Sequence, residues 1–169
     1  MKTAAVLTIS DSSFMKMRRD ESGPAVRARL EAGGWTVPVI EVLPDEPAII
    51  AARLRTLADN GEVSAIFTTG GTGVAVRDVT PEATRTVLDR EIPGLAERMR
   101  AEGTRSTPLA ALSRAVAGTR GQALIVNLPG SPRGAVESLD AILELAPHIV
   151  DLLRGRTAHH EESKRDGTR

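Results

Sequence analysis

Short apolar runs alternate along this chain with stretches in which apolar residues recur at helical spacing. The runs at residues 3–9, 35–43 and 64–69 are each followed by polar or turn-forming residues, as is typical of buried strands. Helix start and stop signals frame the two stretches between them, from Ser22 to Gly34 and from Pro47 to Gly61. Because strands alternate with helices, the pattern predicts an α/β fold with a mostly parallel sheet.

Prolines refine this prediction at two places. Pro38 lies within the run 35–43 and predicts that this strand is at an edge of the sheet, because proline cannot donate a hydrogen bond to a neighbouring strand. Thr80 is expected to be an N-cap, with Pro81 at the first position of its helix. A further helix is expected from about Gly94 to Glu102.

The second half of the chain predicts a small hairpin and a long final helix. Residues 115–117 and 122–126 flank a turn at 118–121, after a helical turn expected at 109–114. The final helix begins near Pro132 and is interrupted at Pro147. Its expected buried stripe consists of Val136, Leu139, Leu143, Ala146 and Val150.

The chain is predicted to form one domain over residues 1–153, followed by a disordered tail over residues 154–169. From Arg154 onward the residues are charged, small and without periodicity. His159 and His160 lie in this tail, where such a pair is usually solvated, so no metal site is expected there.

Composition removes several functional classes. The 169 residues carry 22 basic and 22 acidic side chains, so no basic excess exists to neutralise nucleic acid. The absence of cysteine excludes disulfides, thiolate zinc sites and a cysteine nucleophile. We find neither a signal-peptide pattern nor an apolar run of membrane-spanning length, and we therefore expect a cytoplasmic protein without a membrane partner.

The glycine-rich turn Thr68-Thr69-Gly70-Gly71-Thr72-Gly73 is the strongest chemical signal. Such a turn after a buried strand brings backbone N–H groups close to a ligand, and clustered N–H groups suit phosphate. Asp78 follows at a distance suited to a metal ion that shares the same phosphate. The alternative is a plain turn that binds nothing. No Gly-Lys-Ser/Thr follows, and Val76 stands where a dinucleotide fingerprint needs its third glycine.

Polar turns also follow the other expected strands. They are Ser10-Asp11, Asp45, the glycine turn with Asp78, and Asn127-Leu128-Pro129-Gly130. In parallel α/β sheets the ligand lies beyond the carboxyl ends of the strands, so we expect these four turns to converge on one site.

Taken together, these turns resemble the MoaB/Mog family of molybdenum-cofactor biosynthesis proteins, the molybdopterin adenylyltransferases. The resemblance spans residues 7 to 132 in the family's order. The matching stretches are Leu7-Thr8-Ile9-Ser10-Asp11, Pro44-Asp45-Glu46, Thr68 to Gly73, Arg77 to Thr84, Pro93-Gly94, Leu112-Ser113-Arg114 and Asn127-Leu128-Pro129-Gly130-Ser131-Pro132. One departure is Val74-Ala75-Val76, where many members carry an aromatic residue and a proline.

The resemblance implies a single doubly wound α/β domain that assembles as a homotrimer. It implies Mg²⁺-dependent transfer of AMP from ATP to the terminal phosphate of molybdopterin, which gives adenylyl-molybdopterin and pyrophosphate. A molybdate-insertion protein would then take over the product. The alternative is a non-catalytic molybdopterin-binding carrier or scaffold. A molybdate-insertion domain is a third interpretation, but that activity usually belongs to a longer multidomain chain.

The resemblance also implies a role for individual residues. Asp45 and Asp78 are the expected catalytic residues and metal ligands. The expected nucleotide-binding residues are Ser10, Asp11, Gly70, Gly71, Thr72, Gly73, Asn127, Pro129 and Gly130. The expected pterin-binding residues are Ser106, Thr107, Pro108 and Ser113.

Simpler interpretations stand beside several of these roles. Asp45 occupies an N-cap position, and Asp78 suits a turn. Asn127 could only cap backbone groups at a strand end. Arg77 and Arg114 fit structural ion pairs as well as ligand contacts.

Overall fold

The computed structural model describes residues 2–156, which form a six-stranded mixed sheet with helices on both faces. The strand order is β2-β1-β3-β6-β5-β4. The strands β2, β1, β3 and β6 are parallel, β5 is antiparallel to β6, and β4 is antiparallel to β5. Their bounds are β1 Thr3–Ile9, β2 Thr36–Leu43, β3 Ala65–Thr69, β4 Arg90–Glu91, β5 Ala117–Arg120 and β6 Ala123–Leu128.

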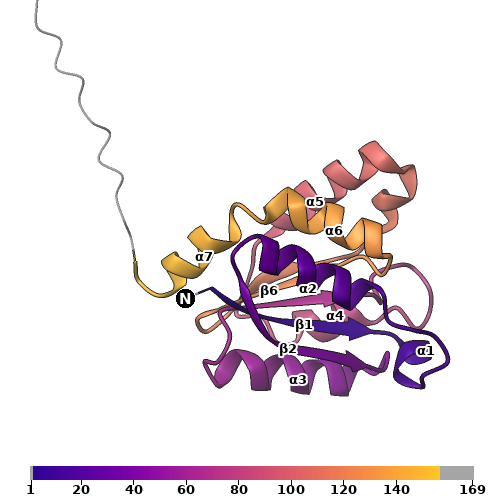
Figure 1. Ribbon diagram of the computed structural model, residues 1–169, viewed down its shortest axis with the longest axis horizontal. Coiled ribbons are helices and arrows are strands. Elements are labelled where there is room, and N and C mark those ends of the chain that lie inside the picture. The colour runs from indigo at the N-terminus through magenta and orange to yellow at the C-terminus, as the bar shows by residue number, and fades with distance from the viewer. Residues whose placement is uncertain (1, 157–169) are drawn as a thin grey trace, which may run out of the picture.

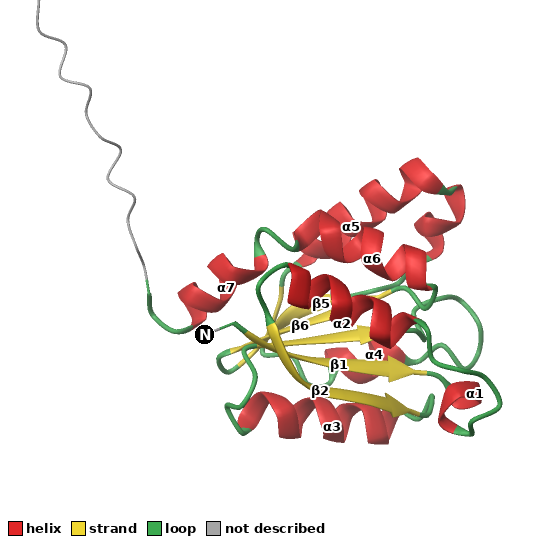
Figure 2. Cartoon of the chain, in the orientation of Figure 1, coloured by secondary structure: helices red, strands yellow, loops and turns green. Residues whose placement is uncertain are grey.

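The helices form two layers, one on each side of the sheet (Figures 1 and 2). Their bounds are α1 Asp11–Phe14, α2 Ser22–Ala32, α3 Pro47–Asp59, α4 Thr80–Arg85, α5 Pro93–Ser106, the 3₁₀ helix η1 Pro108–Leu112, α6 Pro132–Ile142 and α7 Ala146–Leu153. Helices α2, α5, α6 and α7 cover one face, and α3 and α4 cover the other. This arrangement confirms the predicted doubly wound α/β fold.

Two cores result because successive strand residues point to opposite faces of the sheet. Phe67 of β3 packs into the core beneath α2, α5 and α6, where Trp35 meets it edge-on with ring centroids 6.2 Å apart. Its neighbour Ile66 packs into the core beneath α3 and α4. All residues of β3 and β6 are buried, which explains why each strand begins with an apolar run, Ala65 to Phe67 and Ala123 to Val126.

Most predicted elements are present, and some differ in detail. Pro38 lies in β2, which is an edge strand as predicted. The hairpin is also present, but residues 118–120 belong to β5 and the turn lies at Gly121 and Gln122. The last helix is divided into α6 and α7, with Pro147 in the first turn of α7.

Thr80 is not the N-cap that we predicted. Val79 holds that position, and the buried Thr80 hydroxyl donates instead to the Gly70 carbonyl at 3.0 Å. The short elements α1 and β4 carried no recognisable sequence signal.

Two further predictions concern the ends of the chain and the membrane. The predicted tail falls almost entirely on residues 157–169, which lie outside the described residues, so its disorder stays a prediction. Within residues 2–156, no helix is long and apolar enough to cross a membrane.

Candidate functional site

The four polar turns meet at one edge of the sheet, beyond the carboxyl ends of β1, β2, β3 and β6. The turn after β3 lies against the turn after β6. The Thr69 hydroxyl donates to the Pro129 carbonyl at 2.6 Å, and the Gly70 N–H donates to the Leu128 carbonyl at 3.1 Å. A Cβ atom on Gly130 would lie 3.3 Å from the Gly70 Cα, so these two glycines allow the turns to approach closely.

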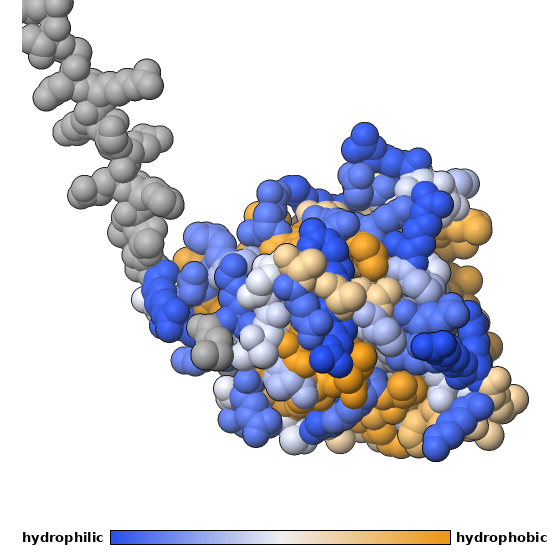
Figure 3. Space-filling model, viewed as in Figure 1, coloured by the Kyte–Doolittle hydropathy of each residue, from blue (hydrophilic) through white to orange (hydrophobic). Residues whose placement is uncertain are grey.

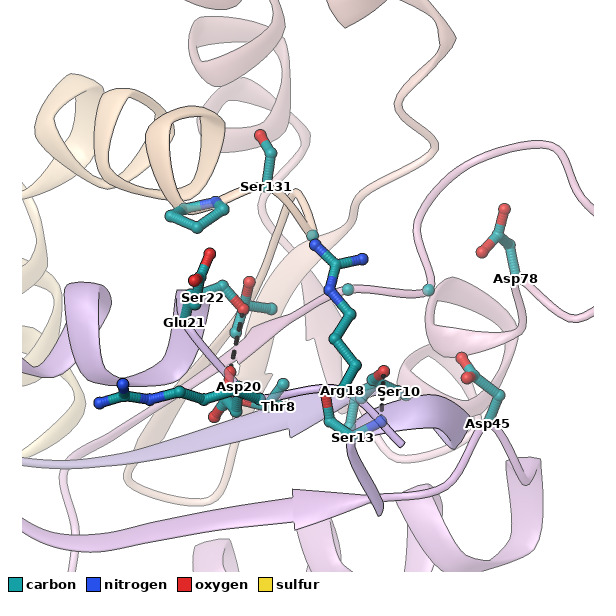
Figure 4. Close-up of a pocket in the computed structure, with 17 residues that line it drawn as sticks. Thr8, Ser10, Ser13, Arg18, Asp20, Glu21, Ser22, Asp45, Asp78 and Ser131 are labelled. Carbon is teal, nitrogen blue, oxygen red and sulfur yellow. Dashed lines mark hydrogen bonds between the residues drawn. The ribbon is translucent and has the colours of Figure 1, made fainter. Parts of the chain in front are cut away.

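A polar cavity of about 360 Å³ opens at this edge (Figure 4). It is lined by the ends of β1 and β3, the loop between α1 and α2, and the start of α6. Asp45 and Asp78 lie on one side, and Thr8, Asp20 and Ser22 lie on the other (Figure 4). We call it the first cavity.

A second cavity of about 460 Å³ adjoins the first. Helices α5, η1 and α6 supply half of its lining residues, and its apolar side chains are Ala96, Met99, Leu109, Ala110, Leu112, Ala115 and Pro129. The two cavities share four lining residues, Gly71, Asp78, Gly130 and Ser131. Asp78 therefore stands where the two cavities meet.

The backbone of the glycine turn can be formed only by residues without a Cβ. Gly70 and Gly71 have φ values of +101° and +66°, in the left-handed region. A Cβ on Gly71 would collide with the Thr80 hydroxyl and would lie 3.1 Å from Asp45 Oδ1. The turn is thus packed between α4 and the loop after β2, with its backbone at the cavity wall.

Asp45 is held by a reciprocal pair of hydrogen bonds with Asp11. The Asp11 N–H donates to Asp45 Oδ2 at 2.9 Å, and the Asp45 N–H donates to Asp11 Oδ1 at 2.9 Å. The side chain of Asp45 is therefore fixed in place by the segment that follows β1, and Glu46 rather than Asp45 holds the N-cap position of α3. The interpretation of Asp45 as an N-cap is wrong.

The two carboxylates of this pair have opposite electrostatic surroundings. A hydrogen bond from Arg77 lowers the pKa of Asp11, and the Asp45 N–H lowers it further. Burial raises the pKa of Asp45, although the Asp11 N–H opposes this rise. The negative charges of Asp11 and Asp78 also raise the pKa of Asp45. A half-buried carboxylate among other carboxylates is suited to a cation.

Two arginines brace the segment that carries Asp78. Arg77 donates to Asp11 Oδ2 at 2.6 Å and to the Asp45 carbonyl at 3.2 Å. Arg114 donates to the carbonyl oxygens of Gly73 at 2.7 Å and Asp78 at 2.6 Å, and it also pairs with Glu82. Both arginines are thus engaged with the protein, which supports their structural interpretation.

The carboxylates fit a magnesium ion. Asp78 lines the first cavity with Asp45, and its own Oδ2 accepts the Ala75 N–H at 2.9 Å. Within residues 2–156, no group of three or more histidine, cysteine or acidic side chains could hold a metal by itself. Mg²⁺ commonly takes one or two carboxylates and completes its shell with water and phosphate oxygens, so two carboxylates suffice.

The predicted site residues differ in how they face the cavities. Ser10 and Gly70 line the first cavity, Gly71 and Gly130 line both, and Thr72, Gly73 and Pro129 line the second, whereas Asp11 lines neither. Among the predicted pterin residues, Thr107 and Ser113 line the second cavity, whereas Ser106 lines a separate hollow with Glu102. Pro108 begins η1 beside Thr107.

Asn127 lies apart from the open cavities. It is fully buried, and its side chain accepts from the Val116 N–H at 3.2 Å and donates to the hydroxyls of Thr68 and Thr84 at 3.0 and 2.9 Å. Its contacts are those of a residue that ties β6 to β3, β5 and α4.

Several cavity residues had no predicted role. Ser131 was part of a quoted motif, and it caps α6 by accepting the Gly134 N–H at 3.1 Å. Arg18 and Asp20 lie in a polar loop whose residues show no periodicity, so only the fold reveals that they face the cavity.

A glycine turn, two carboxylates that line one cavity and converging strand ends make this an α/β protein whose candidate site lies beyond the carboxyl ends of its parallel strands. Residues 5–148 match the sequence model of a family described as "Probable molybdopterin binding domain". The chain belongs to the MoaB/Mog molybdopterin-binding family, which serves molybdenum cofactor biosynthesis.

Named relatives agree with this assignment. The molybdenum cofactor synthesis protein cinnamon of Drosophila melanogaster is 44% identical over 152 residues, which are 89% of this chain and 25% of that longer protein. The molybdopterin adenylyltransferase of Escherichia coli K12 is 41% identical over 147 residues, 86% of this chain and 75% of that protein. The crystal structure of the molybdopterin biosynthesis enzyme MoaB from Thermus thermophilus matches with a TM-score of 0.86 and 53% identity, covering 92% of this chain and 98% of that one.

Proposed function

We propose that this protein is a Mg²⁺-dependent molybdopterin adenylyltransferase. The observation that carries the proposal is the junction of the two cavities, where Asp78 and the glycine turn face both. A group transfer between two bound molecules needs such a junction, because the reacting groups must be held in contact. Relatives that are about 40% identical bear the name of this activity.

Each cavity suits one of the two substrates. The polar first cavity, with backbone at Gly70 and Gly71, would hold the phosphates of ATP. The second cavity, with Met99 and Leu112 in its wall, would hold the flat pterin ring. Thr107 and Ser113 supply hydroxyls there that can orient the ring.

The reaction joins two anions and has little covalent work for the protein. An oxygen of the terminal phosphate of molybdopterin bonds to the α-phosphorus of ATP. The bond from that phosphorus to the bridging oxygen of the β-phosphate breaks, and pyrophosphate leaves with the electron pair. Asp45 and Asp78 would hold Mg²⁺, which supplies positive charge between the two phosphates.

The protein's own residues would fix the geometry of this step. The reciprocal bonds between Asp11 and Asp45 hold one carboxylate, and the Ala75 N–H holds the other. Arg77 ties the segment of Asp78 to Asp11 and Asp45, and Arg114 holds the Asp78 backbone. We also expect a homotrimer and hand-over to a molybdate-insertion protein, on the family resemblance alone.

The second candidate function is a molybdopterin carrier without turnover. The loop Val74 to Val76 favours it, because Val76 is 98% exposed and packs against neither cavity. An enzyme of this family would gain from a loop that closes over its substrates.

One assay separates the two functions. The protein is mixed with ATP, Mg²⁺ and molybdopterin, and pyrophosphate and adenylyl-molybdopterin are measured. The enzyme should release both in equal amounts. A folded protein that binds molybdopterin but releases no pyrophosphate would establish the carrier and overturn the proposal.

A further inference from the structure

The loop between α1 and α2 carries the basic sequence Lys16-Met17-Arg18-Arg19, and it is anchored at both ends. At its start, the N–H groups of Met17 and Arg18 donate to the Ser12 carbonyl at 2.9 and 3.2 Å. At its end, Asp20 accepts the Thr8 hydroxyl at 2.8 Å and the Gly23 N–H at 3.0 Å. The position of Arg18 relative to the sheet edge is therefore set by the fold.

The side chain of Arg18 extends across the first cavity. Figure 4 shows it rising between Asp45 and Asp78 on one side and Thr8 and Asp20 on the other. It lines the first cavity and not the second. An arginine in this position can reach a ligand of the first cavity from between Asp20 and the two carboxylates proposed to hold Mg²⁺.

Arg18 also lacks a protein partner for its charge. Most arginines in the described chain pair with a carboxylate, but no ion pair among residues 2–156 involves Arg18. Arg77 and Arg114, which brace the segment that carries Asp78, are already engaged with Asp11 and Glu82. A guanidinium without a partner is free to bind an anion.

The side chains that line the first cavity carry more negative than positive charge. Its ionisable lining residues are Arg18, Arg19, Asp20, Glu21, Asp45 and Asp78, so carboxylates outnumber cations. A triphosphate would be repelled by this wall unless positive charge met it on both sides. Mg²⁺ on Asp45 and Asp78 would supply positive charge at one side, and Arg18, which rises between these residues and Asp20, would supply it from within the cavity.

We propose that Arg18 binds the β- and γ-phosphates of ATP. This inference rests on the proposed function for the identity of the nucleotide. The reacting α-phosphate would lie at the junction of the cavities, beside Asp78, whereas Arg18 lines the first cavity alone. Its forked guanidinium can bind phosphate oxygens in a bidentate manner. The same contact would stabilise the charge that pyrophosphate gains as the bond to the α-phosphorus breaks.

The test is a set of binding measurements by calorimetry, with Mg²⁺ present and without turnover. The ligands are ATP, AMP, inorganic pyrophosphate and molybdopterin, and the proteins are the parent, Arg18→Gln, Arg18→Lys and Lys16→Gln. The last variant removes the same charge from the same loop at a residue that lines neither cavity. Arg19→Gln tests whether the neighbouring arginine contributes to binding of the same ligands.

We expect Arg18→Gln to weaken ATP and pyrophosphate binding by about tenfold or more, as loss of a charge-assisted hydrogen bond does. AMP and molybdopterin should bind as to the parent protein. Arg18→Lys should recover part of the loss, because it keeps the charge without the fork. Lys16→Gln should match the parent for all four ligands.

Three results would overturn the inference. They are unchanged pyrophosphate binding in Arg18→Gln, an equal loss in Lys16→Gln, and a loss confined to molybdopterin, which would assign Arg18 to the other substrate. Failure of the proposed function is a separate result. A parent protein that binds ATP but releases no pyrophosphate would refute the proposed enzymatic activity. The binding data for the Arg18 variants would still decide whether Arg18 contacts the phosphates.

Discussion

The two cavities have similar volumes but are built from different parts of the fold, and their chemistry differs accordingly. The first is made largely by the turns that end parallel strands, which present glycine backbone and carboxylates. The second is made by α5, η1 and α6, which present apolar side chains such as Met99 and Leu112. Under the proposed function, the parallel sheet would supply the groups for phosphate and metal, and the helices would supply the surface for the pterin ring.

This difference predicts that a substitution in one cavity can weaken binding there with little effect on binding in the other cavity. Among the residues that line both cavities, Asp78 should affect the reaction between the ligands, whereas Gly71, which packs against Asp45, should act mainly on the nucleotide. Substitutions in each region therefore test the comparison.

The largest effect is expected from Asp78→Asn. Asparagine keeps the shape and can still accept the Ala75 N–H, but it removes the charge that would hold Mg²⁺. We expect turnover to fall by roughly a hundredfold or more, because electrostatic stabilisation counts most in the transition state. Molybdopterin affinity should change far less. Pyrophosphate release and pterin binding are measured on the same preparation, and near-normal turnover would remove Asp78 from the mechanism.

A loss confined mainly to the nucleotide is expected from Gly71→Val. The added side chain would meet the Thr80 hydroxyl and Asp45, and a φ of +66° is strained for valine. We expect ATP affinity to fall by roughly tenfold or more, with pterin binding largely kept.

The matched control for this variant is Gly94→Val, at a position where an added Cβ would meet nothing within 4 Å. Circular dichroism and thermal unfolding establish that both variants are folded. Equal loss of both ligands in folded Gly71→Val would show that the site is not divided as described.

A smaller effect, on the pterin alone, is expected from Leu112→Ser. Leu112 lines the second cavity and is 52% exposed, so its replacement should not disturb the core. Loss of its contact with the ring should weaken molybdopterin binding by about fivefold and leave ATP binding unchanged. Leu152→Ser, at an exposed leucine of α7, is the control. Weaker ATP binding in Leu112→Ser would argue against separate cavities.

The smallest expected effect is on the pH dependence of Mg²⁺ binding. Burial raises the pKa of Asp45, so protons should compete with Mg²⁺ at a higher pH than they would at an ordinary aspartate. Mg²⁺ affinity should therefore weaken as the pH falls from about 8 to about 5. This pH dependence is measured by titrating Mg²⁺ into the parent and Asp45→Asn proteins. Identical pH profiles would exclude Asp45 as the titrating ligand.

Protein stability should respond to acid through the other member of this pair. The pKa of Asp11 is lowered in the folded state, so its contribution to stability is present above the unfolded pKa and is lost as the pH falls through the folded value. The raised pKa of Asp45 has the opposite sign, because ionisation of that group costs folding free energy.

The sequence predicted the fold and the strand-end part of the site better than it predicted the helical part. Strand ends in a parallel sheet lie at one edge whatever the loops do, so the convergence of Ser10, Asp45 and Gly70 followed from the order of elements. Side chains that cross a cavity from an irregular loop, such as Arg18, depend on tertiary contacts that leave no periodic signal.

Thr80 and Asp45 show why local signals were misjudged. Both residue types favour N-caps, and tertiary partners took over their side chains. The Thr80 hydroxyl fixes the glycine turn, and the Asp45 carboxylate binds the Asp11 N–H. In both cases a contact distant in sequence replaced the local one.

The distribution of hydrophilic and apolar residues can be seen on one face of the molecule (Figure 3). Figure 3 shows hydrophilic residues over much of the face that it presents, with apolar residues gathered in smaller groups between them. Scattered apolar groups of this kind are ordinary on a folded protein, so we do not interpret those on this face as a further ligand-binding surface.

The central claim is that two ligands occupy adjacent cavities at the same time. It is tested most directly by calorimetry with an ATP analogue whose α,β-bridge is a methylene group and which therefore cannot transfer AMP. The analogue is titrated into protein with Mg²⁺, first alone and then with saturating molybdopterin. Adjacent cavities predict one analogue per chain in both titrations, with similar or tighter affinity when molybdopterin is bound. Loss of analogue binding in the presence of molybdopterin would mean that the ligands share one site, and it would contradict this account.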